Sequence, residues 1–363
     1  METDEGSGDY KVTSSNTWPN EDFIFNEALS NCENGSKLTW DSDKKAVIFH
    51  GRITDKCYVY FDKKITKILF VDYIKSQYTG TQGENNLYFH DASLVNGAKD
   101  NNYRYAGASN TTNNFVCFGS NDATCPTENL YRIIGIFNSS NHGVSNQELI
   151  KLIKYKVADK SLLGTDGDYV SSLNGTSLEA YNYYFWNYMA SNANRNTWST
   201  SLLNKTNLNT NFLNNVGDEW ADKIQEVTWK VGGNTQANII NVNSSGAFNN
   251  EIVSPAVSTT YNAKVGMMYV SDYGYAASPS AWTTNLVSYD SSIKSVNWIA
   301  VDQKEWTITR RSNDTSGAFA ICAGGNVCDG TGTYSYVRPA FYLSSTVSLE
   351  SGNGTINDPY RIK

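Results

Sequence analysis

The six cysteines of this 363-residue chain fall into three pairs of sequence neighbours. The pairs are Cys32 with Cys57, Cys117 with Cys125, and Cys322 with Cys328. Six cysteines allow fifteen pairings, and a single sequence does not select one of them. Local closure is nevertheless the simplest topology, because each pair brackets a turn-rich loop of the kind that small disulfides close. Zinc sites usually place cysteines two to four residues apart, and none of these spacings matches. We therefore predict three local disulfides, with free thiols or a bound metal as the alternative.

Disulfides are typical of exported proteins, and this determines where we expect the chain to work. Residues 1–10 are acidic and rich in Gly and Ser, without the charged and apolar regions of a signal peptide. No apolar run approaches the eighteen residues of a membrane span. We expect an extracellular, cell-surface protein whose signal or anchor segment is absent from this chain. Contact with a membrane would then occur only through that missing N-terminal anchor.

The composition restricts the class of ligand. Hydrophobic residues make up 40% of the chain, enough for a real core, whereas charged residues make up only 18%. Uncharged polar residues, above all Asn, take the place of the missing charges. The net charge is −7 and no basic stripe is present, which argues against nucleic acid. A surface that forms hydrogen bonds without much charge suits a glycan or a host or neighbouring surface protein.

Turn residues and changes in periodicity divide the chain into four segments. Residues 1–21 lack a hydrophobic period and predict a flexible leader. Residues 22–75 carry short β-type runs and predict a small β module, stapled by a Cys32–Cys57 bridge. Residues 76–129 predict a loop-rich connector, and residues 130–363 predict the main domain.

The main domain shows an α+β order of elements. Residues 131–137 and 148–157 predict two strands that form a hairpin. Helices are expected at residues 178–190 and 208–226, the second from an apolar face at helical spacing. Strands follow, notably at residues 264–270 and in the last sixty residues. A hairpin, then helices, then strands is not the alternating order of a parallel α/β sheet.

Several motifs of the main domain occur together and in order, and they resemble a family of exported domains from low-GC Gram-positive bacteria. The motifs are Tyr131-Arg132-Ile133-Ile134-Gly135, Trp198-Ser199-x-Ser201-x-Leu203, Val265 to Tyr275, Trp306-Thr307-Ile308-Thr309-Arg310, Val337-Arg338-Pro339-Ala340-Phe341-Tyr342-Leu343 and Gly352 to Ile362. The segment around Cys32-Glu33-Asn34-Gly35 and Cys57-Tyr58-Val59-Tyr60-Phe61-Asp62 is similar to a short β module that often precedes this domain. The family is functionally uncharacterised.

The resemblance also implies a fold. The W-x-x-x-R and VRP-x-x-x-L patterns are similar to C-type-lectin-like and sulfatase-modifying-factor-like domains, whose late strands frame a variable loop surface. The implied architecture is a small N-terminal β module followed by a C-type-lectin-like α+β main domain.

Six aromatic residues fall within one stretch of thirty residues, with polar residues between them. They are Tyr269, Tyr273, Tyr275, Trp282, Tyr289 and Trp298. Rings stack on sugar faces or anchor protein interfaces, and polar neighbours fix the orientation of the ligand. We predict a ligand-binding surface made of five residues: Asp272, Tyr273, Tyr275, Trp282 and Asn285. The alternative is that these rings fill the core.

Catalytic and metal-binding patterns are weak. Asp166-Gly167-Asp168 resembles the start of a calcium loop, but an ordinary turn explains it better. The Cys322–Cys328 pair lies where sulfatase-modifying enzymes carry reactive cysteines, but the residues around it do not match, which favours a structural bridge. None of the three histidines belongs to a hydrolase motif. We predict no catalytic residue, no metal site and no cofactor.

These observations together predict an adhesin-like binding module that recognises a glycan or a surface protein through aromatic and polar loops. One alternative is a secreted enzyme, either a glycosidase with paired carboxylates or a cysteine oxidase. The other is a purely structural subunit of a cell surface or pilus.

Overall fold

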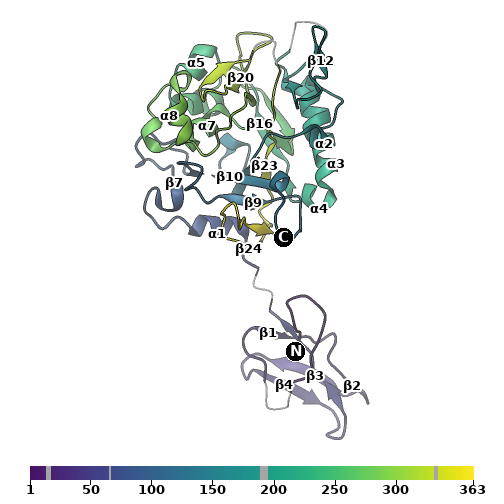
Figure 1. Ribbon diagram of the computed structural model, residues 1–363. Coiled ribbons are helices and arrows are strands. Elements are labelled where there is room, and N and C mark those ends of the chain that lie inside the picture. The colour runs from purple at the N-terminus through teal and green to yellow at the C-terminus, as the bar shows by residue number, and fades with distance from the viewer. Residues whose placement is uncertain (14–17, 65–66, 189–194, 331–333) are drawn as a thin grey trace. The chain divides into compact units, whose positions relative to one another are not determined.

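The chain divides into two units between Lys67 and Ile68 in a computed structural model (Figure 1). Unit 1 comprises Met1–Lys67 and unit 2 comprises Ile68–Lys363. The structure describes residues 1–13, 18–64, 67–188, 195–330 and 334–363. Each unit is described by itself.

Unit 1 consists of three antiparallel strand pairs nested one inside another. The pairs are β1 (Phe23–Phe25) with β6 (Phe61–Lys63), β2 (Asn31–Cys32) with β5 (Cys57–Tyr58), and β3 (Lys37–Asp41) with β4 (Ala46–His50). Cys32 lies directly opposite Cys57 and is bonded to it. The predicted bridge is therefore present, and it joins the middle pair of strands rather than the first strand to the last.

Within unit 1, the first residues of the chain pack against the strands. The backbone N–H of Glu2 donates to the carbonyl of Phe61 at 2.9 Å, and the Glu2 carboxylate accepts from the N–H of Lys63 at 2.8 Å. Tyr10 donates its hydroxyl to Asp62 at 2.5 Å, and the Trp18 ring lies 5.5 Å from the Phe61 ring. These contacts involve the described part of the segment 1–21, which the sequence predicts to be a flexible leader. Polar hydrogen bonds, which leave no hydrophobic period in the sequence, hold this part of the leader in place.

Unit 2 is built around an eight-stranded antiparallel sheet. The main path runs β15 (Ile224–Gln225), β23 (Ala340–Leu343), β11 (Leu149–Lys154), β10 (Leu130–Phe137), β8 (Tyr103–Tyr105) and β7 (Leu87–Phe89). Two further strands lie off this path, β18 (Val265–Gly266) on β23 and β9 (Phe115–Cys117) on β10. The predicted hairpin of β10 and β11 is confirmed, and every residue of both strands is buried. A strand covered on both faces appears in sequence as a mostly apolar run, and β10 follows this pattern apart from the buried Arg132.

Smaller sheets surround the central one. They are β12 (Ser172–Leu173) with β13 (Thr176–Ser177), β14 (Tyr184–Phe185) with β22 (Tyr334–Ser335), β16 (Val227–Lys230) with β17 (Thr260–Ala263), β24 (Leu349–Ser351) with β25 (Arg361–Ile362), and the three strands β19 (Glu305–Arg310), β20 (Ala318–Ile321) and β21 (Val327–Asp329). The chain is thus of the α+β class, as predicted.

The helices are short. The α-helices are α1 (Phe70–Ser76), α2 (Lys160–Leu163), α3 (Phe212–Val216), α4 (Asp218–Ala221), α5 (Gln236–Ile240), α6 (Ser244–Phe248), α7 (Val270–Ala276) and α8 (Ser291–Ser295). Wider π-type turns cover Leu203–Asn211 and Asn249–Val253, and 3₁₀ turns cover Glu84–Asn86, Thr127–Asn129, Ser140–His142, Trp198–Thr200, Pro279–Ala281 and Leu286–Ser288. Figure 1 shows α2, α3 and α4 on one side of unit 2 and α5, α7 and α8 on the other. Within the described residues, none of these helices has the length and apolar character needed to cross a bilayer.

The predicted connector, residues 76–129, is part of unit 2. It supplies β7, β8 and β9 to the central sheet. Residues 68–75, which the sequence assigned to the β module, contain most of α1, where Phe70, Val71 and Ile74 are buried. Pairing between strands far apart in sequence makes this segment part of the core, and no local pattern reports such pairing.

The predicted helix at residues 178–190 is wrong for the described part, residues 178–188, which hold the strand β14 and no helix. Met189 and Ala190 lie outside the described residues. Tyr184 and Trp186 are buried, whereas Tyr183 and Phe185 are partly exposed. This alternation has the period of a strand, with every second side chain on the same face.

The helix predicted at residues 208–226 is interrupted. Helical backbone begins at Leu203, and Gly217 ends α3 with a φ of +83°, a value in the left-handed region that favours glycine. After α4 the chain enters β15 at Ile224.

The predicted strand at residues 264–270 covers only Val265–Gly266, and Val270 begins α7. Carboxylates satisfy the free N–H groups at this helix start. Asp272 accepts from the N–H of Tyr269 at 2.8 Å, and Glu251 accepts from the N–H of Ser271 at 2.6 Å. Because Glu251 is twenty residues away in sequence, local pattern alone could not predict this helix.

Candidate functional site

Four of the five residues predicted to bind a ligand lie in the core. Tyr273 and Trp282 are 0% exposed, Tyr275 is 1% exposed and Asp272 is 3% exposed. Tyr273 donates its hydroxyl to the carbonyl of Gly325 at 2.5 Å, and the Trp282 ring lies 5.3 Å from that of Tyr275. These rings present no surface to a ligand, so the predicted binding surface is corrected to a buried aromatic group (Tyr273, Tyr275 and Trp282).

Asp272 and Asn285 have different surroundings. Asp272 forms a buried ion pair with Lys151, whose Nζ lies 2.6 Å from the Asp272 Oδ2. Burial lowers the pKa of Lys151, and the Asp272 carboxylate opposes that effect. Asn285 is exposed. The structure does not bring Asn285 together with the buried members of the predicted set into one accessible site.

A second buried charge cluster lies around Arg104. Its guanidinium donates to both carboxylate oxygens of Asp100, at 2.8 and 2.6 Å, and His142 Nε2 lies 2.9 Å from Asp100. Burial alone would raise the pKa of Asp100, but Arg104 and His142 reverse that effect and hold it below its ordinary value. Asp100 also borders a surface hollow of about 480 Å³. Because its carboxylate is already bound by Arg104 and His142, we interpret this cluster as structural.

The strongest exposed arrangement lies on the outer side of β14 and β22. Six aromatic residues line it, and we call them the aromatic face: Tyr181, Tyr183, Phe185, Tyr188, Tyr334 and Tyr336. Strand alternation positions them, because the intervening Tyr184 and Ser335 are buried and lie opposite each other in register. The two strands thus contribute one buried side to the core and one aromatic side to solvent.

The rings of the aromatic face form a continuous series of contacts. Tyr183 lies 5.0 Å from Tyr181, 4.6 Å from Tyr334 and 4.7 Å from Tyr336 between ring centroids. Phe185 stacks on Tyr188 at 4.6 Å with an interplanar angle of 27°.

The two ends of the series are the most open, with Tyr181 45% and Tyr188 52% exposed. Burial and a hydrogen bond with Tyr336 raise the pKa of Tyr183 to about 12, so this hydroxyl stays neutral at physiological pH. The face therefore offers flat apolar rings together with neutral hydroxyl groups.

A cavity of about 230 Å³ adjoins this face, and Phe185 and Tyr188 belong to both. Its other lining residues are Leu173, Trp186, Asn187, Arg195, Trp306, Ser316 and Gly330. The volume is below the 300–1,000 Å³ of pockets for drug-sized molecules. The cavity suits one ring or the end of a chain, with the aromatic face extending beside it.

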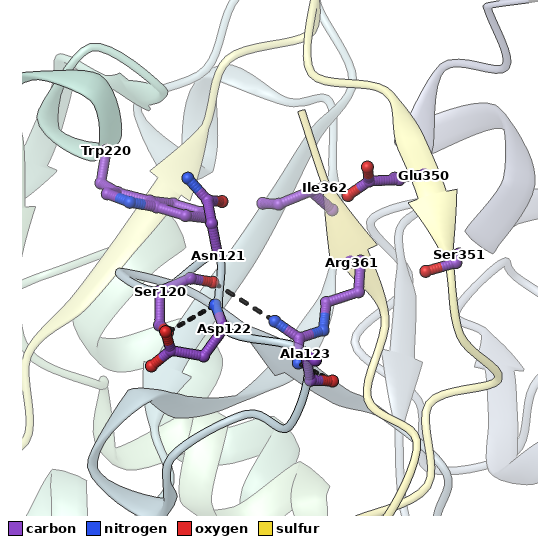
Figure 2. Close-up of a pocket in the computed structure, with 9 residues that line it drawn as sticks. All are labelled: Ser120, Asn121, Asp122, Ala123, Trp220, Glu350, Ser351, Arg361 and Ile362. Carbon is purple, nitrogen blue, oxygen red and sulfur yellow. Dashed lines mark hydrogen bonds between the residues drawn. The ribbon is translucent and has the colours of Figure 1, made fainter. Parts of the chain in front are cut away.

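A hollow of about 310 Å³ lies between the Cys117–Cys125 loop and the β24–β25 hairpin, and Figure 2 shows its lining. Arg361 points to the loop, and its guanidinium donates to the carbonyls of Ser120 and Ala123 at 3.3 and 3.2 Å. We interpret this hollow as structural, because the Arg361 guanidinium links the Cys117–Cys125 loop to the β24–β25 hairpin.

The cysteine-oxidase alternative depends on the Cys322–Cys328 pair. Cys322 and Cys328 form a disulfide across the loop between β20 and β21, and the Tyr273 hydroxyl holds that loop at Gly325. The predicted bridges Cys117–Cys125 and Cys322–Cys328 are thus both present, like the bridge in unit 1. No cluster of three or more His, Cys, Asp or Glu residues in the described parts could hold a metal ion.

Comparison of the chain with protein-family models, with curated proteins and with solved structures gave no match.

The sequence contained a signal for the aromatic face that the prediction missed. Tyr181, Tyr183 and Phe185 recur at every second position, as do Tyr334 and Tyr336. Such spacing indicates a strand with one aromatic side. The prediction followed the aromatic residues interleaved with polar ones after Tyr269 instead, and that stretch is buried.

Proposed function

We propose that the protein is an exported binding module of a bacterial cell surface and that the aromatic face binds glycans. The observation that carries this proposal is the continuous series of solvent-facing rings beside a small cavity. Rings of this kind stack on the apolar faces of sugars, and tyrosine hydroxyls exchange hydrogen bonds with sugar hydroxyls. The C-type-lectin-like relationship of unit 2 belongs to the same proposal and rests on the motifs of its late strands.

The rest of the molecule is consistent with a binding module outside the cell. Three disulfides are typical of extracellular proteins and give weak support for export. A protein ligand is the competing possibility, because Tyr is also enriched at protein interfaces. We favour a glycan because the cavity is small and the face carries neutral hydroxyls rather than charges.

A glycan-array screen of the purified chain, with and without calcium, tests the proposal. Affinity for any glycan that binds should then be measured for Tyr188→Ala and Tyr334→Ala. Each variant should bind at least tenfold more weakly, a change of about 1.4 kcal/mol.

Tyr58→Ala is the matched control, because Tyr58 is a tyrosine of unit 1 that is 42% exposed and lies outside the face. Its affinity should equal that of the wild type. A silent array, or face variants that bind like the wild type, would refute the glycan proposal. A pull-down with surface proteins would then test the protein alternative.

A further inference from the structure

Arg195 is the cation of the cavity beside the aromatic face. Its guanidinium carbon lies 5.6 Å from the centre of the Tyr188 ring, and Arg195 is part of the cavity lining. Its Nε atom is buried and has no hydrogen-bond partner. Leaving a buried donor unsatisfied is unfavourable, and more so for a charged group. An unsatisfied donor of this kind in a cavity is an indication of a ligand that supplies the acceptor.

Arg195 is partly exposed, whereas the three buried arginines of unit 2 are engaged by the protein itself. Arg104 binds the carboxylate of Asp100, and Arg338 binds that of Glu305 at 2.5 and 2.6 Å. Arg132 donates to Asn114 and to several carbonyls. Arg195 differs from all three, because among the described residues it forms no hydrogen bond or ion pair through its guanidinium.

The charge around Arg195 is also uncompensated. The cavity lining contains no Asp or Glu. Neither do residues 189–194 and 331–333, which lie beside lining residues in the sequence. Asp314, in the loop after β19, and Asp329, at the end of β21, both pair with Arg311, at 3.7 and 2.7 Å. The cavity therefore carries a positive charge that an anionic ligand would neutralise.

We infer that the glycan bound at this site carries an anionic group, a sugar carboxylate or a sulfate ester, which Arg195 holds while the sugar rings lie along the rest of the aromatic face. This inference rests on the proposed function and specifies its ligand class. The planar guanidinium offers several parallel N–H donors, a geometry that matches carboxylate and sulfate oxygens. The cation–π contact with Tyr188 keeps the guanidinium beside the aromatic face before the ligand arrives.

The test compares three oligosaccharides that share one core: one ending in a carboxylate-bearing sugar, one in a sulfated sugar and one in the neutral counterpart. The wild type should bind at least one anionic form about tenfold or more tightly than the neutral form, and the preference should shrink as salt rises. Arg195→Gln should remove this preference, so that it binds the anionic and neutral forms equally. Arg195→Lys keeps the positive charge but lacks the planar set of N–H donors of a guanidinium. It should therefore retain only part of the preference.

Arg52→Gln is the matched control, because Arg52 is an exposed arginine of unit 1. It should leave both the affinity and the preference as in the wild type. The comparison of the two anionic forms identifies which group the site prefers, and an Arg195-dependent preference for either supports the inference. Equal binding of neutral and anionic forms, or a preference that survives Arg195→Gln, would overturn the inference and leave the proposed function standing. Absence of any glycan binding by the wild type would overturn the proposed function and this inference with it.

Discussion

Two sets of aromatic side chains in unit 2 have similar chemistry and opposite surroundings. The buried aromatic group lies in and after α7, where all seven residues of the helix are buried. The aromatic face lies on β14 and β22, where one side of each strand is covered and the other meets solvent. The first set holds the core together and the second is available to a ligand. Both segments are rich in aromatic residues, so their number alone does not separate core from surface, whereas the period at which the rings recur indicates which of them reach the surface.

The largest expected effect is a loss of stability when one ring of the buried aromatic group is removed. Trp282→Ala should lower the free energy of unfolding by about 3–5 kcal/mol, because it leaves a cavity where a fully buried ring was packed. The change also leaves the carbonyl of Ala277 without the indole N–H that it accepts at 2.9 Å. Urea unfolding at neutral pH would measure the loss. A loss below about 1 kcal/mol would mean that this ring is outside the core and would reopen its assignment to a ligand site.

The next effect concerns the start of α7 and depends on pH. Burial raises the pKa of Glu251 to about 7, although Ser271 and Thr309 donate hydrogen bonds to it. The folded protein thus binds this proton more tightly than the unfolded chain. The contribution of Glu251 to stability is fully present below its unfolded pKa of 4.5 and is lost as the pH rises from 4.5 to about 7.

Glutamine does not titrate, so Glu251→Gln does not lose this contribution to stability as the pH rises. The free energy of unfolding of Glu251→Gln, relative to that of the wild type, should therefore rise by up to about 3 kcal/mol over this pH range. Urea unfolding at pH 5 and pH 8 measures the change, and contributions from His90 and His142 cancel between the two proteins. Glu350→Gln, at an exposed position, is the control and should follow the wild type. Parallel pH profiles for Glu251→Gln and the wild type would contradict the assignment.

The smallest expected effect tests the exposed side. Tyr188→Ala should change the free energy of unfolding by no more than about 0.5 kcal/mol, since the ring is half exposed and away from the core. The same variant should lose glycan affinity, so stability and binding separate here. A stability loss above 2 kcal/mol would show that the face supports the fold, and the contrast between the two aromatic sets would then fail.

The sequence predicted those parts of the fold that local pattern determines. The three disulfides, the β10–β11 hairpin, β19 and β20 all follow from nearby residues. The start of α7 did not, because Glu251 and Asp272 satisfy its N–H groups, and Glu251 is distant in sequence. The place of residues 76–129 in the central sheet depends on strand pairing, and local sequence patterns do not predict that pairing either.

The candidate site was less accessible to prediction. The aromatic face combines residues 181–188 with residues 334–336, which are about 150 positions apart and meet only through the β14–β22 pairing. Each half carries the spacing of a strand, but neither half indicates its partner. Arg195 has no motif around it, and its importance comes only from the absence of an acceptor in the described structure around it.

The local closure of the three disulfides also affects how the chain matures. The bonded cysteines are separated by 25, 8 and 6 positions, and no ring contains a cysteine of another pair. A chain that emerges from a translocation channel N-terminus first can thus complete each bridge before the next cysteine pair appears. Correct oxidation then requires no isomerase to reshuffle mispaired thiols, a step that otherwise takes seconds to hours. Recombinant production should accordingly tolerate oxidising secretion without a co-expressed disulfide isomerase.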